Sequence, residues 1–156
     1  MFVSLLARVQ SSGIAATIGQ SQLITALLSA VHVLGLTLIV GSTLVSSLRL
    51  LGVVLRDRPV AEVTAGPRRG LLLGLGASTL TGFLLFTPRA TTAVQNGFFQ
   101  AKMLLIASAV LFSFTFYRHV ARGGSSSPLQ VKLAGALGLA LWYGVVLAGA
   151  AFILLE

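Results

Sequence analysis

The sequence contains no cysteine, so disulfides, thiolate metal sites and redox-active thiols are excluded. Sulfur ligands for copper(I) are also scarce, because Met103 is the only methionine besides Met1. The remaining residues form no hydrolase triad, phosphate-binding loop or zinc motif. We therefore predict that the chain is not an enzyme, although a role in electron transfer stays open.

Acidic residues are also scarce. The sequence has three, Asp57, Glu62 and Glu156, and none of them lies inside a long apolar stretch. Coupled transporters usually relay protons through carboxylates within the membrane. A proton-driven pump is therefore disfavoured.

Eleven lysines and arginines give the chain a formal net charge of +8. Most of the arginines lie next to apolar stretches, where retention in the cytoplasm and attraction to anionic headgroups explain them. No soluble basic module accompanies them. We predict a lipid bilayer as the partner of these charges, and no nucleic acid.

Apolar residues make up 56% of the sequence and the mean hydropathy is +0.97, which excludes a water-soluble domain. Four stretches approach the roughly 20 apolar residues that cross a bilayer: residues 21–48, 70–86, 98–117 and 129–155. Residues 1–20 carry no clean signal-peptide cleavage site, and we expect a short interfacial helix there. The predicted fold is an all-α transmembrane four-helix bundle that forms one domain over residues 1–156.

The positive charges predict the orientation of these spans. The first and third loops carry most of them: Arg49, Arg56, Arg58, Arg68, Arg69, Arg118, Arg122 and Lys132. The second loop has only Arg89, with Lys102 nearby. Because cytoplasmic loops are enriched in lysine and arginine, both termini are predicted outside the bacterial inner (cytoplasmic) membrane.

Small residues recur at helical spacing in the spans, and such stripes let membrane helices approach closely. They are Gly70, Gly74, Ser78 and Gly82 in the second span, and Ala136, Ala140, Gly144 and Ala148 in the fourth. In the first span, polar and small residues share one face: Thr25, Ser29, His32, Gly35, Ser42, Ser46 and Arg49. We expect these faces to contact other helices of this chain, a second copy or other membrane subunits.

An ionisable residue inside a span is by default a candidate functional residue, and His32 and Lys102 are the two in this sequence. At 1.5 Å per residue, both lie about 25 Å from the arginine-rich ends of their helices, in the outer half of the membrane. His119 lies at the opposite surface. The two histidines of one subunit therefore cannot ligate one haem from both sides.

His32 has two interpretations. It is the candidate metal ligand of a b-type haem, alone, with a non-histidine ligand or across a dimer, with Arg89 and Lys102 near the propionates or lipid phosphates. Alternatively, neutral His32 hydrogen-bonds a serine or a backbone carbonyl of a neighbouring helix. In that case Lys102 extends to the outer headgroups.

At the predicted cytoplasmic surface, Arg118, His119 and Arg122 form a basic cluster. A metal site would need further ligands that are not nearby in the sequence. We therefore predict that these three residues contact anionic lipid headgroups.

Three stretches carry a family resemblance: VHVLG at 31–35, TGFLLF at 81–86 and NGFFQAK at 96–102. On these stretches the chain resembles small bacterial four-helix membrane proteins that are loosely similar to the membrane part of copper-resistance D proteins. The resemblance implies a four-helix bundle with His32 and Lys102 at positions that such proteins occupy. The lack of methionine and cysteine ligands departs from a copper-handling pattern.

Three functions follow from these observations. The first is a non-catalytic accessory subunit of a larger membrane complex, with a redox complex as the candidate. The second is an electron carrier that binds b-type haem through His32. The third is a small permease for a solute or a metal, suggested by the polar face of the first span.

Overall fold

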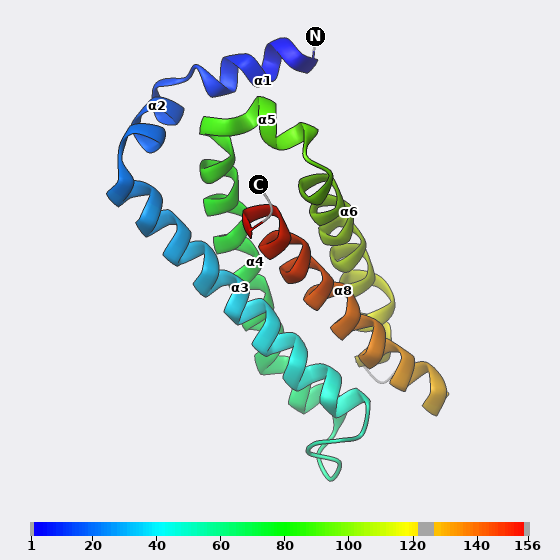
Figure 1. Cartoon of the computed structure of the whole chain (residues 1–156). Helices are drawn as coiled ribbons and strands as arrows, with labels where there is room; N and C mark the ends of the chain where they lie inside the picture. Colours follow the sequence, from blue (N-terminus) through cyan, green and yellow to red (C-terminus); the bar gives the residue numbers. More distant parts are fainter. Residues whose placement is uncertain (1, 122–126, 155–156) are drawn as a thin grey trace.

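The structure is a computed structural model, and it describes residues 2–121 and 127–154. All regular elements in these ranges are helices: α1 Phe2–Gln10, α2 Gly13–Gln20, α3 Gln22–Leu50, α4 Val60–Phe86, η1 Thr87–Arg89, α5 Ala90–Gln95, α6 Gly97–Phe112, η2 Ser113–Tyr117, α7 Arg118–Ala121 and α8 Pro128–Leu154 (Figure 1). The all-α prediction is confirmed. Glu156 and Arg122 lie outside the described residues.

Four helical segments are long and apolar enough to cross a membrane: Gln22–Leu50, Val60–Gln95, Gly97–Val120 and Pro128–Phe152. Their outer surfaces are apolar, and Leu73, Leu104 and Leu147 are each about 70% exposed. Such a continuous apolar exterior is stable only in lipid. The chain is therefore a multi-pass membrane protein.

The second long helix begins at Val60, so the predicted start at residue 70 was wrong. Glu62 lies in the first turn of α4, where a negative charge is favourable next to the helix dipole. Pro67 and Arg68 follow within the helix rather than before it. Apolarity marks the part of a helix that contacts lipid, whereas the helix itself extends beyond that part.

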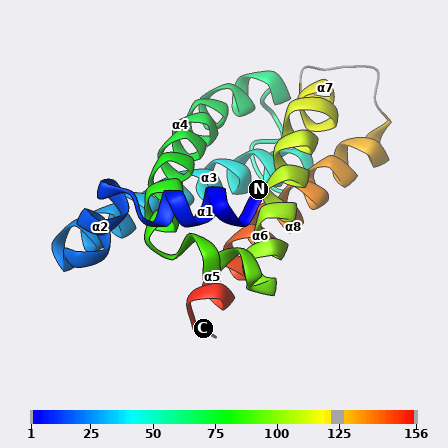
Figure 2. The ribbon, with the colours of Figure 1, turned by 90° about the horizontal axis from the view of Figure 1, so that it is seen from above.

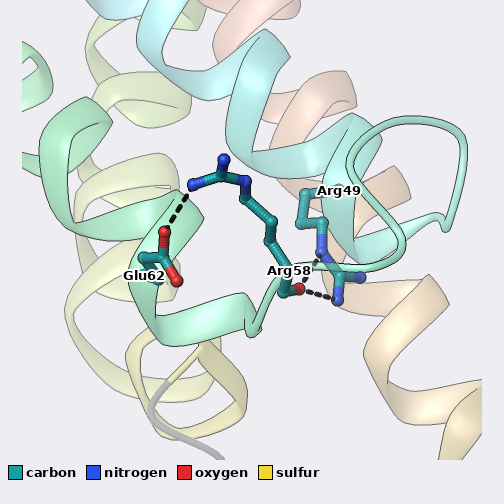
Figure 3. A network of polar contacts seen from close by, with 3 residues as sticks. All are labelled: Arg49, Arg58 and Glu62. Carbon is teal, nitrogen blue, oxygen red and sulfur yellow. Dashed lines mark hydrogen bonds and ion pairs between the residues drawn. The ribbon is translucent and has the colours of Figure 1, made fainter.

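The loop between α3 and α4 is held by polar contacts at its base. Arg49 Nε donates a hydrogen bond of 3.0 Å to the carbonyl of Arg58, and the Arg58 side chain pairs with Glu62 at 2.9 Å (Figure 3). These groups lie at one end of the molecule, which we call the arginine-rich end. The opposite end, which carries α1, α2 and α5, is called the α5 end (Figure 1).

Two short helices replace the single N-terminal helix that the sequence predicted. The chain bends at Ser11 and Ser12, and the Ser12 hydroxyl caps α2 by accepting a hydrogen bond from the amide of Ala15. The Gln10 side chain accepts hydrogen bonds from the amide and hydroxyl of Thr91 at 3.0 and 2.7 Å. These bonds fasten the N-terminal helices across the α5 end.

The four long helices do not form a closed square. Helix α3 packs against α4 and α8, and α6 packs against α8. Viewed from above, α4 lies beside α3 and α6 lies beside α8 (Figure 2). At the α5 end the stacked rings of Phe86 on α4 and Phe99 on α6, whose centroids are 5.5 Å apart, join the two pairs.

The α3–α4 interface is built from the small residues that the sequence predicted. A Cβ atom on Gly74 would lie 2.5 Å from the carbonyl oxygen of Gly35, and one on Gly35 would lie 3.0 Å from that of Gly74. Gly82 lies against the imidazole ring of His32. The two backbones touch, as small residues allow in membranes, and the predicted role of this stripe is confirmed.

The predicted stripe of α8 was wrong in its first half only, because Gly144 lies against Leu105 of α6. Ala136 and Ala140 are exposed, whereas Ala134, Gly135 and Gly138 are buried against neighbouring helices. A Cβ on Gly135 would lie 2.8 Å from the carbonyl oxygen of Ser47 on α3. Because α8 is apolar on all sides and rich in small residues on two faces, spacing alone does not identify the packed face.

Candidate functional site

The site around His32 is built where α3 meets α4. The imidazole Nδ1 lies 3.1 Å from the hydroxyl oxygen of Thr81, and the Ser78 hydroxyl donates to the His32 carbonyl at 3.3 Å. A Cβ on Gly82 would lie 2.9 Å from Cε1 of the ring. Only glycine at this position lets the imidazole lie flat against α4.

The hydrogen bonds of Thr81 fix the form of the imidazole. The Thr81 hydroxyl has one proton, which it donates to the carbonyl of Ala77 at 2.7 Å. Its oxygen therefore accepts the proton of His32 Nδ1, so the neutral ring carries its lone pair on Nε2. No hydrogen bond joins Nε2 to any residue in the described ranges.

Lys102 reaches the same part of the molecule from α6. Its side chain is half-buried, and a Cβ on Gly149 of α8 would lie 3.3 Å from the ammonium nitrogen. The charges of Lys102 and a protonated His32 lie close enough to interact. Among the described residues, no hydrogen bond or ion pair engages the ammonium.

Three aromatic rings cover this region on the side of the α5 end. Phe86 stacks on Phe99, and Phe99 contacts Phe152 with centroids 5.7 Å apart. Phe86 lies one turn beyond Gly82 on α4, and Phe99 lies one turn before Lys102 on α6. The rings of α4, α6 and α8 thus shield the histidine and the lysine from the water at that end.

The other predicted site residues are spread over the two ends. Arg89 is exposed on η1 at the α5 end, and His119 is exposed on α7, on the far side of the membrane-spanning region. His32 and His119 therefore do not share a site. Arg118 is half-buried rather than on the free surface, and Arg122 lies outside the described residues.

A metal held by protein groups alone finds few ligands here. The described residues contain no cluster of three histidine, cysteine or carboxylate side chains. His32 would be a single ligand. Any metal at this position therefore has to arrive with donors of its own, as in a cofactor.

The sequence did not predict a second feature, a cleft between α4 and the η2–α7 segment at the arginine-rich end. It has a volume of about 190 Å³. Its walls carry Ser42, Ser46, Thr64, Ser113, Tyr117, Arg68 and Arg118, and Trp142 lies at its base. The serines of the first span were visible as a polar face, but no sequence signal joined them to residues of the other three helices.

The fold and the two polar regions define a class: a four-helix, multi-pass membrane protein with ionisable groups inside its spans. Within that class, the chain belongs to a family of unknown function, DUF6644, which matches residues 2–154. No curated protein and no solved structure matches the chain significantly. The resemblance to copper-resistance D proteins therefore stays a prediction.

Proposed function

We propose that this chain is a small, non-catalytic subunit of a larger redox complex in the bacterial inner membrane, and that it holds a b-type haem through His32. One observation carries the proposal. A fixed imidazole with its lone pair on Nε2 and the ammonium of Lys102 share one region inside the spans, and neither has a hydrogen-bonding partner for these atoms among the described residues.

The donor set fits a haem with one histidine ligand. Histidines that bind metals usually donate the proton of the other ring nitrogen to an oxygen acceptor, which sets the tautomer and the orientation of the ring. His32 does this with Thr81, and Gly82 leaves room for the ring. When bound, haem would supply one-electron transfer.

Lys102 supports an acidic cofactor in particular. An ammonium inside a membrane span is costly unless it has a counter-charge, and no carboxylate of the described chain is placed to provide one, since Asp57 and Glu62 are exposed at the arginine-rich end. A propionate would pair with Lys102. The exposed Arg89 lies at the same end and is the candidate for the second propionate.

The size of the described chain outside the spans supports the subunit role. The α3–α4 loop is short, α5 and α6 are separated by Asn96 alone, and α1 and α2 lie flat on the α5 end. These segments are too small to form a docking domain for an electron donor or a catalytic domain of their own. Electrons would therefore pass between this chain and neighbouring subunits.

Absorption spectroscopy tests the haem directly. We expect protein expressed with sufficient haem and purified in detergent to show a Soret band, and His32→Ala to lose it. His119→Ala is the matched control, because His119 is exposed on the other side of the spans, and it should keep the band. Mass analysis of the same samples should identify co-purifying subunits.

Two further variants test the residues that would assist His32, the proposed haem ligand. Lys102→Gln should lower the haem content of folded protein, while Lys132→Gln, an exposed lysine on α8, should leave it unchanged. Thr81→Val should keep the Soret band but shift the reduction potential, because the ligand loses its hydrogen-bond acceptor. A folded, haem-sufficient preparation of the native chain without a Soret band would reject the haem proposal.

A further inference from the structure

We propose that the cleft between α4 and the η2–α7 segment binds the phosphate headgroup of an anionic phospholipid. This inference is independent of the haem proposal, because the cleft is lined near the first turns of α4, at Thr64 and Arg68, whereas His32 contacts the other end of that helix at Thr81. The occupant we assign is a lipid of the leaflet at the arginine-rich end.

The cleft exists because two neighbouring helices do not pack along its length. Helix α4 packs on α3, whereas η2 and α7 pack on α8. The space between α4 and the η2–α7 segment is therefore lined by side chains. Its volume of about 190 Å³ exceeds that of an engineered cavity of about 150 Å³ that holds benzene. A phosphate or glycerol phosphate group is of this size, and a tetrapyrrole is far larger.

A local change of helix type shapes one wall. Residues Ser113–Tyr117 form a π-helix between α6 and α7, an arrangement often found at functional sites. The wider turn brings Ser113, Phe114, Tyr117 and Arg118 to the cleft. Ser113 is also fixed from the base, since its hydroxyl accepts a hydrogen bond of 3.2 Å from Trp142 Nε1.

Hydroxyl groups give the cleft its polar lining. The Tyr117 hydroxyl is buried close to Ser46 and Ser47, yet makes no hydrogen bond of normal geometry within the described residues. Thr64 donates to the carbonyl of Val60 at 2.9 Å and keeps its oxygen as an acceptor. The Tyr117 hydroxyl therefore has a proton to donate to a phosphate, whereas the Thr64 oxygen can accept a proton from a hydroxyl of the headgroup.

The charge of the lining is positive on both sides. Arg68 is exposed on α4, and Arg118 is half-buried on α7 across the cleft. No acidic side chain is among the residues that line the cleft. Two guanidinium groups with hydroxyl donors between them favour a phosphate, and basic pockets between membrane helices are a recognised form of anionic lipid site.

The apolar part of the lining indicates a lipid rather than a free anion. Leu71 lies one turn deeper than Arg68 on α4, Leu72 follows it, and Phe114 lies one turn deeper than Arg118. These side chains continue into the apolar, lipid-facing exterior. A headgroup held by the arginines would therefore place its acyl chains along leucine and phenylalanine.

Trp142 provides the measurement, because it is the only tryptophan of the sequence and lies at the base of the cleft. The protein is reconstituted in phosphatidylcholine vesicles that contain acyl-brominated phosphatidylglycerol or, in a parallel series, acyl-brominated phosphatidylcholine. Bromine quenches tryptophan fluorescence on close approach. We expect quenching at a several-fold lower mole fraction of the anionic lipid.

Arg68→Gln should reduce this preference about fivefold, as the loss of one arginine near an anionic surface implies. Arg69→Gln is the matched control, since Arg69 is exposed on the next position of α4 and does not line the cleft. It should keep the preference. Arg118→Lys, which retains the charge of a half-buried residue, should fold and lose less than Arg68→Gln.

A final arm separates the two sources of phosphate. Inorganic phosphate and glycerol phosphate are added to protein in neutral vesicles, and we expect neither to change the fluorescence of Trp142 or to compete with the brominated anionic lipid. Competition by the soluble anions would overturn the assignment to a lipid. Equal quenching by both brominated lipids, or equal effects of Arg68→Gln and Arg69→Gln, would overturn the site itself.

Discussion

The two sides of helix α4 differ in the size and polarity of the side chains that they present. Towards α3 it presents Gly74, whose Cβ would lie 2.5 Å from the backbone of Gly35. Towards η2 and α7 it presents Thr64, Arg68 and Leu71, which leave a cleft of about 190 Å³. Since lipid tails are as apolar as leucine, no hydrophobic force closes the second side. Backbone contact requires small residues, and larger polar side chains leave space for a ligand.

The largest effect is expected from a side chain placed in the tight interface. Gly74→Val should destabilise the protein by about 3 kcal/mol or prevent its folding, because the new atoms meet the Gly35 carbonyl. Thermal unfolding in detergent measures this. Gly76→Val is the control on the same helix, since nothing lies within 4 Å of its Cβ position. Equal losses in the two variants would show that α3 and α4 do not touch at Gly74.

The α3–α8 interface should respond in the same direction but less strongly. Gly135→Val places atoms near the Ser47 carbonyl, which would lie 2.8 Å from the Cβ, and should cost about 2 kcal/mol. The control is Ala136→Val, because Ala136 is exposed. Comparing the two variants by the same unfolding measurement also tests which face of α8 is packed. A larger loss for Ala136→Val would favour the predicted stripe instead.

A change at the base of the cleft should have a smaller effect. Trp142→Phe removes the hydrogen bond to Ser113 and should cost about 1 kcal/mol, detected as a lower thermal midpoint. Tyr143→Phe should be neutral, because the Tyr143 side chain is exposed. If Trp142→Phe were also neutral, the wall formed by the π-helix would not depend on this bond.

The smallest effect is expected at the loop that joins α3 to α4. Glu62→Gln breaks the ion pair with Arg58, in which both side chains are more than half exposed. Exposed pairs of this spacing contribute about 0.3–0.5 kcal/mol. High salt should slightly lower the free energy of unfolding of the native chain, because it screens the ion pair. The variant, which lacks the pair, should show no such change. A loss comparable to that of Gly135→Val would mean that the loop, rather than the helix contacts, limits stability.

The sequence predicted the four spans because each is a long apolar run, and it predicted the α3–α4 contact because glycine and serine recur every four residues on one face of α4. It misplaced the start of α4, since Arg68 and Arg69 ended the apolar run but not the helix. It also chose the wrong face for the first half of α8. Two faces of that helix carry small residues, and only the positions of its neighbours distinguish them.

The candidate sites divide in the same way. His32 and Lys102 stood out individually, because ionisable residues are rare inside spans, but their shared location follows from how α3 and α6 are arranged around α8. The cleft was not predicted at all. Its residues come from four helices, and the π-helix that brings Ser113 and Tyr117 to it leaves no periodic signal.

What the sequence alone determined is the class of molecule: apolar runs of bilayer length require helices in lipid, because every backbone polar group must be paired within its own segment. What only the tertiary structure decided is which side chains meet. The proton on Nδ1 of His32 is set by Thr81 and Ala77 of another helix, and the cleft is set by where α4 and the η2–α7 segment lie relative to each other. Both depend on distances between segments far apart in the chain, which composition and periodicity do not encode.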